Sequence, residues 1–218
     1  MGSITRSFAN NITTGGVLLP ASLVNNSISN VTAYNASLGV GGMTLISSQT
    51  ASASASISFT TGIDSTYKEY QFYFINIHPA TDATNFEFNF STDSGSNYNV
   101  TKTTTAFRAV HDEADTTTAL TYRTAEDLAQ DNAFQRIASD VGNGADESCS
   151  GTLTLFNPAS TTYVKHFIAT TNNYTSGNFS IEGFYAGYGN TTSAINAIQF
   201  KMSAGNIDDG VILMFGIK

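Results

Sequence analysis

The residues best suited to metal chemistry are an acidic run beside a histidine. In VHDEADTT, His111 is followed by Asp112, Glu113 and Asp115. Clustered carboxylates are ligands that Ca²⁺ and Mg²⁺ prefer. The spacing matches neither an EF-hand loop nor an HExxH zinc helix. We therefore interpret the run as a solvated loop between two strands, with Asp112, Glu113 and Asp115 as the alternative cation site.

The other chemically capable residues form no catalytic pattern. His78 precedes Pro79 at the end of a predicted strand, and His166 lies inside another. No GxSxG nucleophile elbow occurs, and the glycines of GVGG (39–42) lack the lysine of a phosphate-binding loop. Glycosidase carboxylates have no fixed sequence spacing, so an enzyme such as a depolymerase stays a third alternative. We predict a non-enzymatic protein with no catalytic residues and no cofactor.

A tyrosine-rich stretch supplies the candidate binding residues. Tyr174, Tyr185 and Tyr188 lie in NNYTSGNFSIEGFYAGYGNTT, among small polar residues. Aromatic rings in such surroundings can contact sugars or protein partners. The interpretation we favour is a sheet with one face on the core and the other against neighbouring subunits. The alternative is a glycan or partner contact at these three tyrosines.

Composition narrows the class of protein. Charged residues make up 12% of the 218 residues, about half the usual share. The formal net charge is −8, which argues against a nucleic acid or an anionic membrane as partner. The one cysteine, Cys149, cannot form an intrachain disulfide. The N-terminus has no basic and apolar regions of the kind that a signal peptide needs.

Alternating residues predict an all-β fold. In NFEFNFSTDSGSNYNV, Phe86, Phe88 and Phe90 share one strand face, and a turn at 93–96 predicts a hairpin that resumes at Tyr98. Many Thr and aromatic residues also favour strands. We expect a jelly-roll-like antiparallel β-sandwich over residues 44–218. The further predicted strands are 52–62, 69–79, 105–111, 120–124, 150–157, 163–170, 179–188, 195–202 and 210–217.

One segment resists this pattern. Residues 124–142, TAEDLAQDNAFQRIASDVG, place Leu128, Phe134 and Ile137 only partly on one helical face. Three Asp residues lower its helix propensity. We predict a connecting segment with one or two helical turns.

The first 43 residues differ from the rest of the chain. Arg6 is the only charged residue before Asp64, and short apolar groups interrupt Asn, Ser and Thr patches. A segment of this composition is expected to order against other protein, where a buried unpaired charge would be costly. We predict an extended N-terminal arm over residues 1–43. Its assembly contacts would be Val17, Leu18, Leu19, Pro20, Leu23, Val24, Ile28 and Val31.

Four stretches of the chain resemble structural proteins of tailed bacteriophages, particularly those of marine cyanobacterial phages. They are SFANNITTGGVLLPASLVNNSISNVT, STDSGSNY, HDEADTTTALTY and NIDDGVILMFGIK. The resemblance implies a virion component with an N-terminal arm and a C-terminal β-sandwich, often trimeric, without catalytic residues.

We therefore expect a capsid decoration (cement) protein or head fibre, located in the virion. Its expected partners are two further copies in a homotrimer and the major capsid protein or other virion proteins. The alternative is a tail-fibre or receptor-binding module that recognises a host surface glycan.

Overall fold

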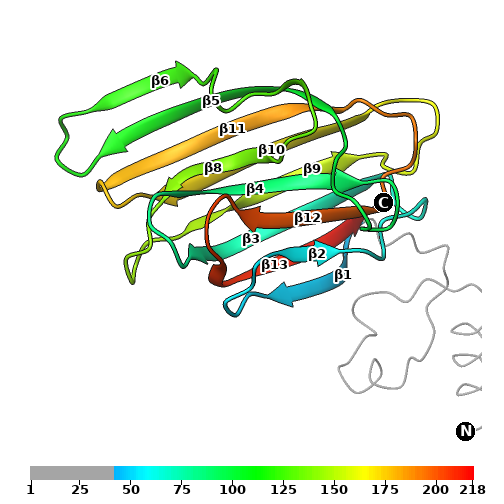
Figure 1. The fold of residues 1–218 in the computed structure, drawn as a ribbon, viewed down its shortest axis with the longest axis horizontal. Coiled ribbons are helices and arrows are strands. Elements are labelled where there is room, and N and C mark those ends of the chain that lie inside the picture. The colour runs from blue at the N-terminus through cyan, green and yellow to red at the C-terminus, as the bar shows by residue number, and fades with distance from the viewer. Residues whose placement is uncertain (1–41) are drawn as a thin grey trace, which may run out of the picture. The chain divides into compact units, whose positions relative to one another are not determined.

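The computed structural model describes residues 42–218, which form thirteen strands and, within that range, no helix (Figure 1). The all-β prediction is therefore confirmed. No helix in the described part of the chain is long and apolar enough to span a membrane. The strands are β1 (Met43–Thr50), β2 (Ile57–Phe59), β3 (Glu69–Pro79), β4 (Thr84–Ser91), β5 (Lys102–Asp112), β6 (Thr118–Tyr122), β7 (Ala129–Asp131), β8 (Gln135–Val141), β9 (Cys149–Phe156), β10 (Lys165–Tyr174), β11 (Phe179–Gly189), β12 (Ala197–Met202) and β13 (Ile207–Ile217).

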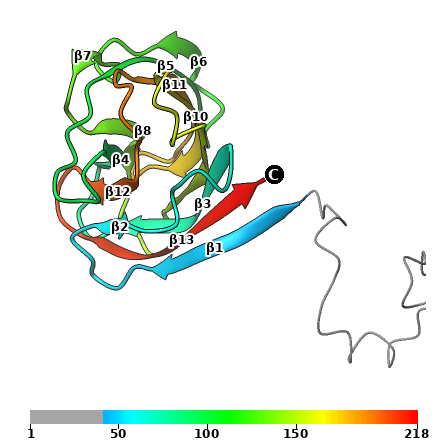
Figure 2. The ribbon, with the colours of Figure 1, turned by 90° about the vertical axis from the view of Figure 1, so that its right-hand side faces the viewer.

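Two antiparallel sheets pack face to face as a sandwich (Figure 2). The larger sheet has the order β1-β13-β3-β9-β10-β11-β5-β6, and β7 also pairs with β5. The smaller sheet has the order β2-β12-β4-β8. The nine-stranded sheet therefore extends well beyond the width of the four-stranded one.

Eight of the strands pair in the nested order of a jelly roll. The first pairs with the last (β1 with β13), the second with the seventh (β2 with β12), and likewise β3 with β9 and β4 with β8. This is the pairing that a double Greek key produces. Strands β5, β6 and β7 follow β4, and β10 and β11 follow β9, so two insertions supply the other five strands. We call these five the inserted strands.

Phenylalanine side chains fill the space between the jelly-roll sheets. The ring of Phe200 on β12 lies 5.2 Å from that of Phe74 and 5.8 Å from that of Phe86, centroid to centroid. The rings of Phe59, Phe72 and Phe88 lie within 6.3 Å of it. The alternation that placed Phe86, Phe88 and Phe90 on one strand face is confirmed, because all three are fully buried.

The predicted hairpin after Phe90 is wrong. The turn exists: the Asp93 carboxylate accepts the backbone N–H of Asn97 at 2.9 Å. However, β4 pairs with β12 and β8, and the chain crosses to the other sheet before β5 begins at Lys102. Turn residues predict where a chain reverses, but they do not specify the partner of the strand that follows.

Two further predictions need correction. The strand predicted over 52–62 is limited to β2, because Ala53 has φ of 50° and only a single bridge forms at Ser54. The connecting segment predicted over 124–142 has one turn near Glu126 but otherwise forms β7 and β8. The predicted arm, apart from its last two residues, lies outside the described residues.

Candidate functional site

The HDEAD run forms the turn of the hairpin between β5 and β6. The carboxylate of Asp112 accepts backbone N–H groups from Thr116 at 2.9 Å and Thr117 at 2.8 Å. A hydrogen bond from the Thr116 hydroxyl, followed by these backbone bonds, lowers the pKa of Asp112. Asp115 instead faces His111, whose Nε2 lies 3.2 Å from its Oδ1. The carboxylates of Asp112 and Asp115 therefore make contacts within the turn. Residues 42–218 contain no group of three His, Cys, Asp or Glu side chains placed to hold a metal.

Tyr185 does not lie at the surface, so its prediction as a contact residue is wrong. It is 1% exposed on the inner face of β11, and its hydroxyl donates to Glu126 Oε2 at 3.1 Å. Burial, followed by the neighbouring Glu126 charge, raises its pKa. Tyr174 and Tyr188 lie on the opposite face of the sheet, where both are partly exposed.

Buried Glu126 is the centre of an ionic cluster under the inserted strands. Its Oε1 lies 2.8 Å from Arg123 Nε, 3.6 Å from Arg108 Nη1 and 3.7 Å from Arg136 Nη1. These are the three arginines of residues 42–218. Arg108 also reaches Asp140 at 3.4 Å. The cluster holds β5, β8 and the loop after β6 together. Its charges pair with one another and stabilise the fold.

The larger sheet has an outer face that points away from the smaller sheet. Along β9, β10, β11, β5 and β6 this face is nearly uncharged: one side chain, Glu182, is a carboxylate, and none is Lys or Arg. We call the following eighteen residues, of which nine are aliphatic or aromatic and one is a carboxylate, the apolar face. They are Phe156, His166, Tyr188, Thr103, Thr154, Ile168, Ala186, Thr105, Thr152, Thr170, Phe184, Phe107, Tyr122, Ser150, Asn172, Glu182, Ala109 and Leu120.

Large apolar side chains project from this face. Ile168 is 54% exposed, and Leu120 on the edge strand β6 is 71% exposed. The rings of Phe107 and Phe184 stack with centroids 4.7 Å apart and planes 9° apart. Isolated exposed hydrophobic residues are normal, but a contiguous group of them usually marks an interaction site.

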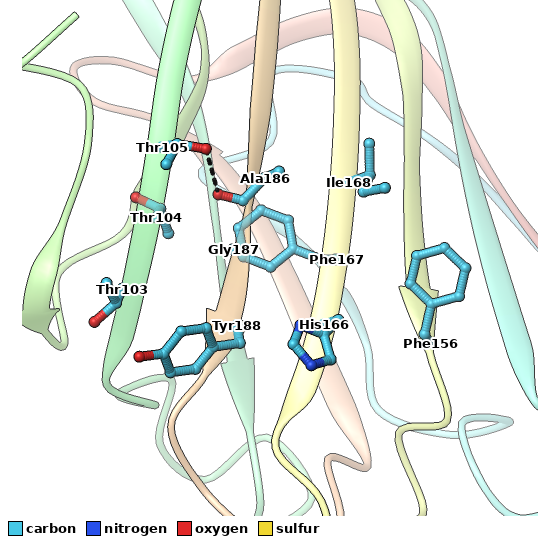
Figure 3. Close-up of a pocket in the computed structure, with 10 residues that line it drawn as sticks. All are labelled: Thr103, Thr104, Thr105, Phe156, His166, Phe167, Ile168, Ala186, Gly187 and Tyr188. Carbon is cyan, nitrogen blue, oxygen red and sulfur yellow. Dashed lines mark hydrogen bonds between the residues drawn. The ribbon is translucent and has the colours of Figure 1, made fainter.

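A shallow hollow of about 500 Å³ opens on the same face (Figure 3). Ala186 on β11 pairs with Ile168 on β10 and with Thr105 on β5, and its short side chain leaves space between these two neighbours. Tyr188 and His166 lie side by side in the next row, with ring centroids 6.1 Å apart. The walls are mainly carbon, and the hydroxyl of Thr105 is already directed at the Ala186 carbonyl at 3.4 Å. The hollow suits an apolar side chain better than a polar ligand.

Of the apolar face, sequence reasoning named Tyr188 as a candidate contact and His166 as a strand histidine, and beside the face it named the turn residues. The predicted arm contacts, Val17 to Val31, lie outside the described residues. The apolar face could have been recognised from β11, where Glu182 is the one charged residue and the strand otherwise lacks the charges that usually mark a solvent side. Cross-strand neighbours such as Phe107 and Phe184 are 77 positions apart in the sequence, so their stacking carried no local signal.

No protein-family model, curated protein or solved structure matches this chain.

Proposed function

We propose that the protein is a non-enzymatic virion structural protein that decorates or cements a phage capsid as a decoration protein or head fibre. Residues 1–43 attach it to the major capsid protein or another virion protein. The jelly roll is the body that this attachment holds on the particle.

The observation that carries the proposal is the position of β1 at one edge of the larger sheet, opposite the inserted strands. Strand β1, the first after the proposed arm, lies at one edge, and β6 lies at the other (Figure 1). A chain anchored just before β1 therefore holds its inserted strands far from the anchor. Jelly rolls occur in viral capsid proteins and also in lectins, and a fold alone does not define a function. The sequence before Asp64, in which Arg6 is the only charged residue, is what favours attachment to protein.

The test is incorporation into particles. The full chain is co-expressed with neighbouring capsid genes, and its copies per purified particle are counted by quantitative mass spectrometry. The double substitution Leu18→Asp and Leu19→Asp is expected to lower occupancy about tenfold or more, because an unpaired carboxylate is costly to bury.

The matched control places the same two charges at polar positions of the same segment, Ser27→Asp and Ser29→Asp, and should keep normal occupancy. The proposal fails if the wild-type chain is absent from particles, or if the Leu18 and Leu19 variant is incorporated as well as the wild type.

The alternative of a host-glycan receptor module has less support. Of its three tyrosines, Tyr185 is buried beside Glu126. Tyr188 borders a hollow with mainly carbon walls, whereas sugar recognition needs several convergent hydrogen-bonding groups.

A further inference from the structure

We propose that the apolar face is an interface between copies of this chain, in which a second copy covers the outer face of β9, β10, β11, β5 and β6. This inference concerns the chain and its own copies, so it holds whether or not the protein belongs to a virion.

The distribution of charges favours a second copy of the chain over a charged partner. Of the eight Lys and Arg residues in 42–218, Lys102 and Lys165 are fully buried, and three arginines converge on Glu126. All 17 acidic residues of the chain lie in this range, and 16 of them lie outside the apolar face. Two copies that met elsewhere would bring like charges together, whereas this face has one carboxylate, Glu182, to accommodate.

The area is sufficient for a specific contact. Five strands about 4.8 Å apart and about seven residues long form a patch of about 24 by 24 Å, or about 600 Å². Two such faces together would bury about 1,200 Å² or more, which reaches the range of specific protein–protein interfaces. When this face meets the same face of a second copy, the contact is isologous and closes as a two-fold dimer, whereas a cyclic trimer would pair the face with a different surface of the next copy.

The shape of the face is also suited to a copy of itself. It carries projecting side chains, among them Leu120 and Ile168, and a hollow of about 500 Å³ over Ala186. Sheets that pack face to face interdigitate such side chains. The face therefore supplies both the projections and a recess that could receive them.

The edge beside the face is unprotected. All five residues of β6 are exposed, and the strand contains no charge and no proline. Monomeric proteins usually protect open edges with Lys, Pro or a covering segment. An uncharged edge continuous with an apolar face is expected where a neighbouring copy covers both.

The experiment measures association of the full chain by sedimentation velocity over a range of concentrations. We expect the wild type to form oligomers, and Ile168→Glu to weaken association about tenfold or more, because the new carboxylate would be buried without a partner. The matched control is Leu45→Glu, since Leu45 on β1 is 53% exposed and Ile168 is 54% exposed on the same outer face. The control should associate like the wild type. Both side chains are exposed, so thermal unfolding should show that both variants fold.

A second measurement does not depend on a disruptive charge. Cys149 is the one native cysteine and is fully buried, so an introduced surface thiol can be labelled selectively. In Ile168→Cys, maleimide labelling should slow as the protein concentration rises, while labelling of Leu45→Cys should not change.

Three results would overturn the proposal. One is a wild-type chain that stays monomeric at high concentration. Another is equal loss of association for Ile168→Glu and Leu45→Glu, which would assign the contact to the whole sheet. The third is a monomeric chain in which Ile168→Glu abolishes attachment to particles or to a glycan, which would assign the face to a different partner.

Discussion

The two halves of the larger sheet bury their inner faces by different chemistry. In the jelly roll, inward side chains are mainly phenylalanine and aliphatic, as around Phe200. Under the inserted strands they are mainly polar, as with Lys102, Thr104, Arg108 and Asn173. The first half depends on apolar area removed from water, and the second on hydrogen bonds and ion pairs.

The strand β8 explains the difference. It is an edge strand of the smaller sheet, because it pairs with β4 on one side only. Its free carbonyl groups on the other side face β10. The Thr171 hydroxyl donates to the Ile137 carbonyl, and the Asn173 amide donates to the Ser139 carbonyl at 3.0 Å. Unpaired buried carbonyls are costly, so polar inward residues on β10 are what allow the sheet to extend past β8.

The largest effect is expected from Phe200→Ala, at the centre of the aromatic half. Removing a ring that contacts five others should lower the free energy of unfolding by about 3–5 kcal/mol, since the lost burial adds to the cost of a cavity. Urea denaturation measures this loss. Phe215→Ala on the outer face of β13 is the control and should lose at most about half as much, because that ring is partly exposed. Equal losses would contradict the description of a core centred on Phe200.

Glu126→Gln tests the ionic half with almost no change in shape. It leaves Arg108, Arg123 and Arg136 without their shared carboxylate. We therefore expect the free energy of unfolding to fall by about 3 kcal/mol. Asp140→Asn removes the other carboxylate on Arg108, but Asp140 is 54% exposed, and its loss should stay below about 1 kcal/mol. If urea denaturation gave the two variants similar stabilities, the buried cluster would not be what holds the inserted strands to β8.

Gly183→Ala examines how closely the polar half is packed. A methyl group at Gly183 would come within 2.5 Å of the Tyr185 ring, which lies over this glycine. We expect a loss of about 1–3 kcal/mol from overpacking. The loss should shrink in a Tyr185→Leu background, where a double-mutant cycle isolates the coupling. Gly177→Ala is the control, since its methyl group would lie 3.2 Å from Phe179. A coupling near zero would mean that the ring is free to move aside.

The same contrast explains what could be predicted from the sequence. The strand Glu69–Pro79 was predicted with its bounds because aromatic and polar residues alternate sharply along it. The strand β8 was missed because its inward residues include Gln135 and Ser139, which look like solvent-facing residues unless their partners are known. Tyr185 was placed at the surface for the same reason, since its partner Glu126 is 59 residues away. Periodicity detects an apolar core, but it cannot detect a polar one whose hydrogen bonds join distant segments.

Lys102 offers the mildest test of the polar half. It is fully buried on β5, where its Nζ donates to Asn89 Oδ1 at 2.6 Å and to the Val100 carbonyl at 2.8 Å. Burial lowers the pKa of Lys102 from 10.5 to about 7, and nearby Asp131 offsets part of this. Between pH 7 and 10.5 the unfolded chain therefore binds more protons at this position than the folded one does. The destabilisation by Lys102 is complete below pH 7 and diminishes as the pH rises.

Lys102→Met should remove this dependence. Stability of the wild type should rise relative to the variant by up to about 1.4 kcal/mol per pH unit above pH 7. Buried Cys149 acts in the opposite direction: burial raises its pKa from 9.0 to about 12, so it costs stability above about pH 9. This term is common to both proteins and cancels in their difference. Chemical denaturation of both proteins from pH 6 to 9 measures the difference in their free energies of unfolding. If the two free energies changed in parallel with pH, Lys102 would keep its charge in the folded state. The polar half would then tolerate a buried ammonium group.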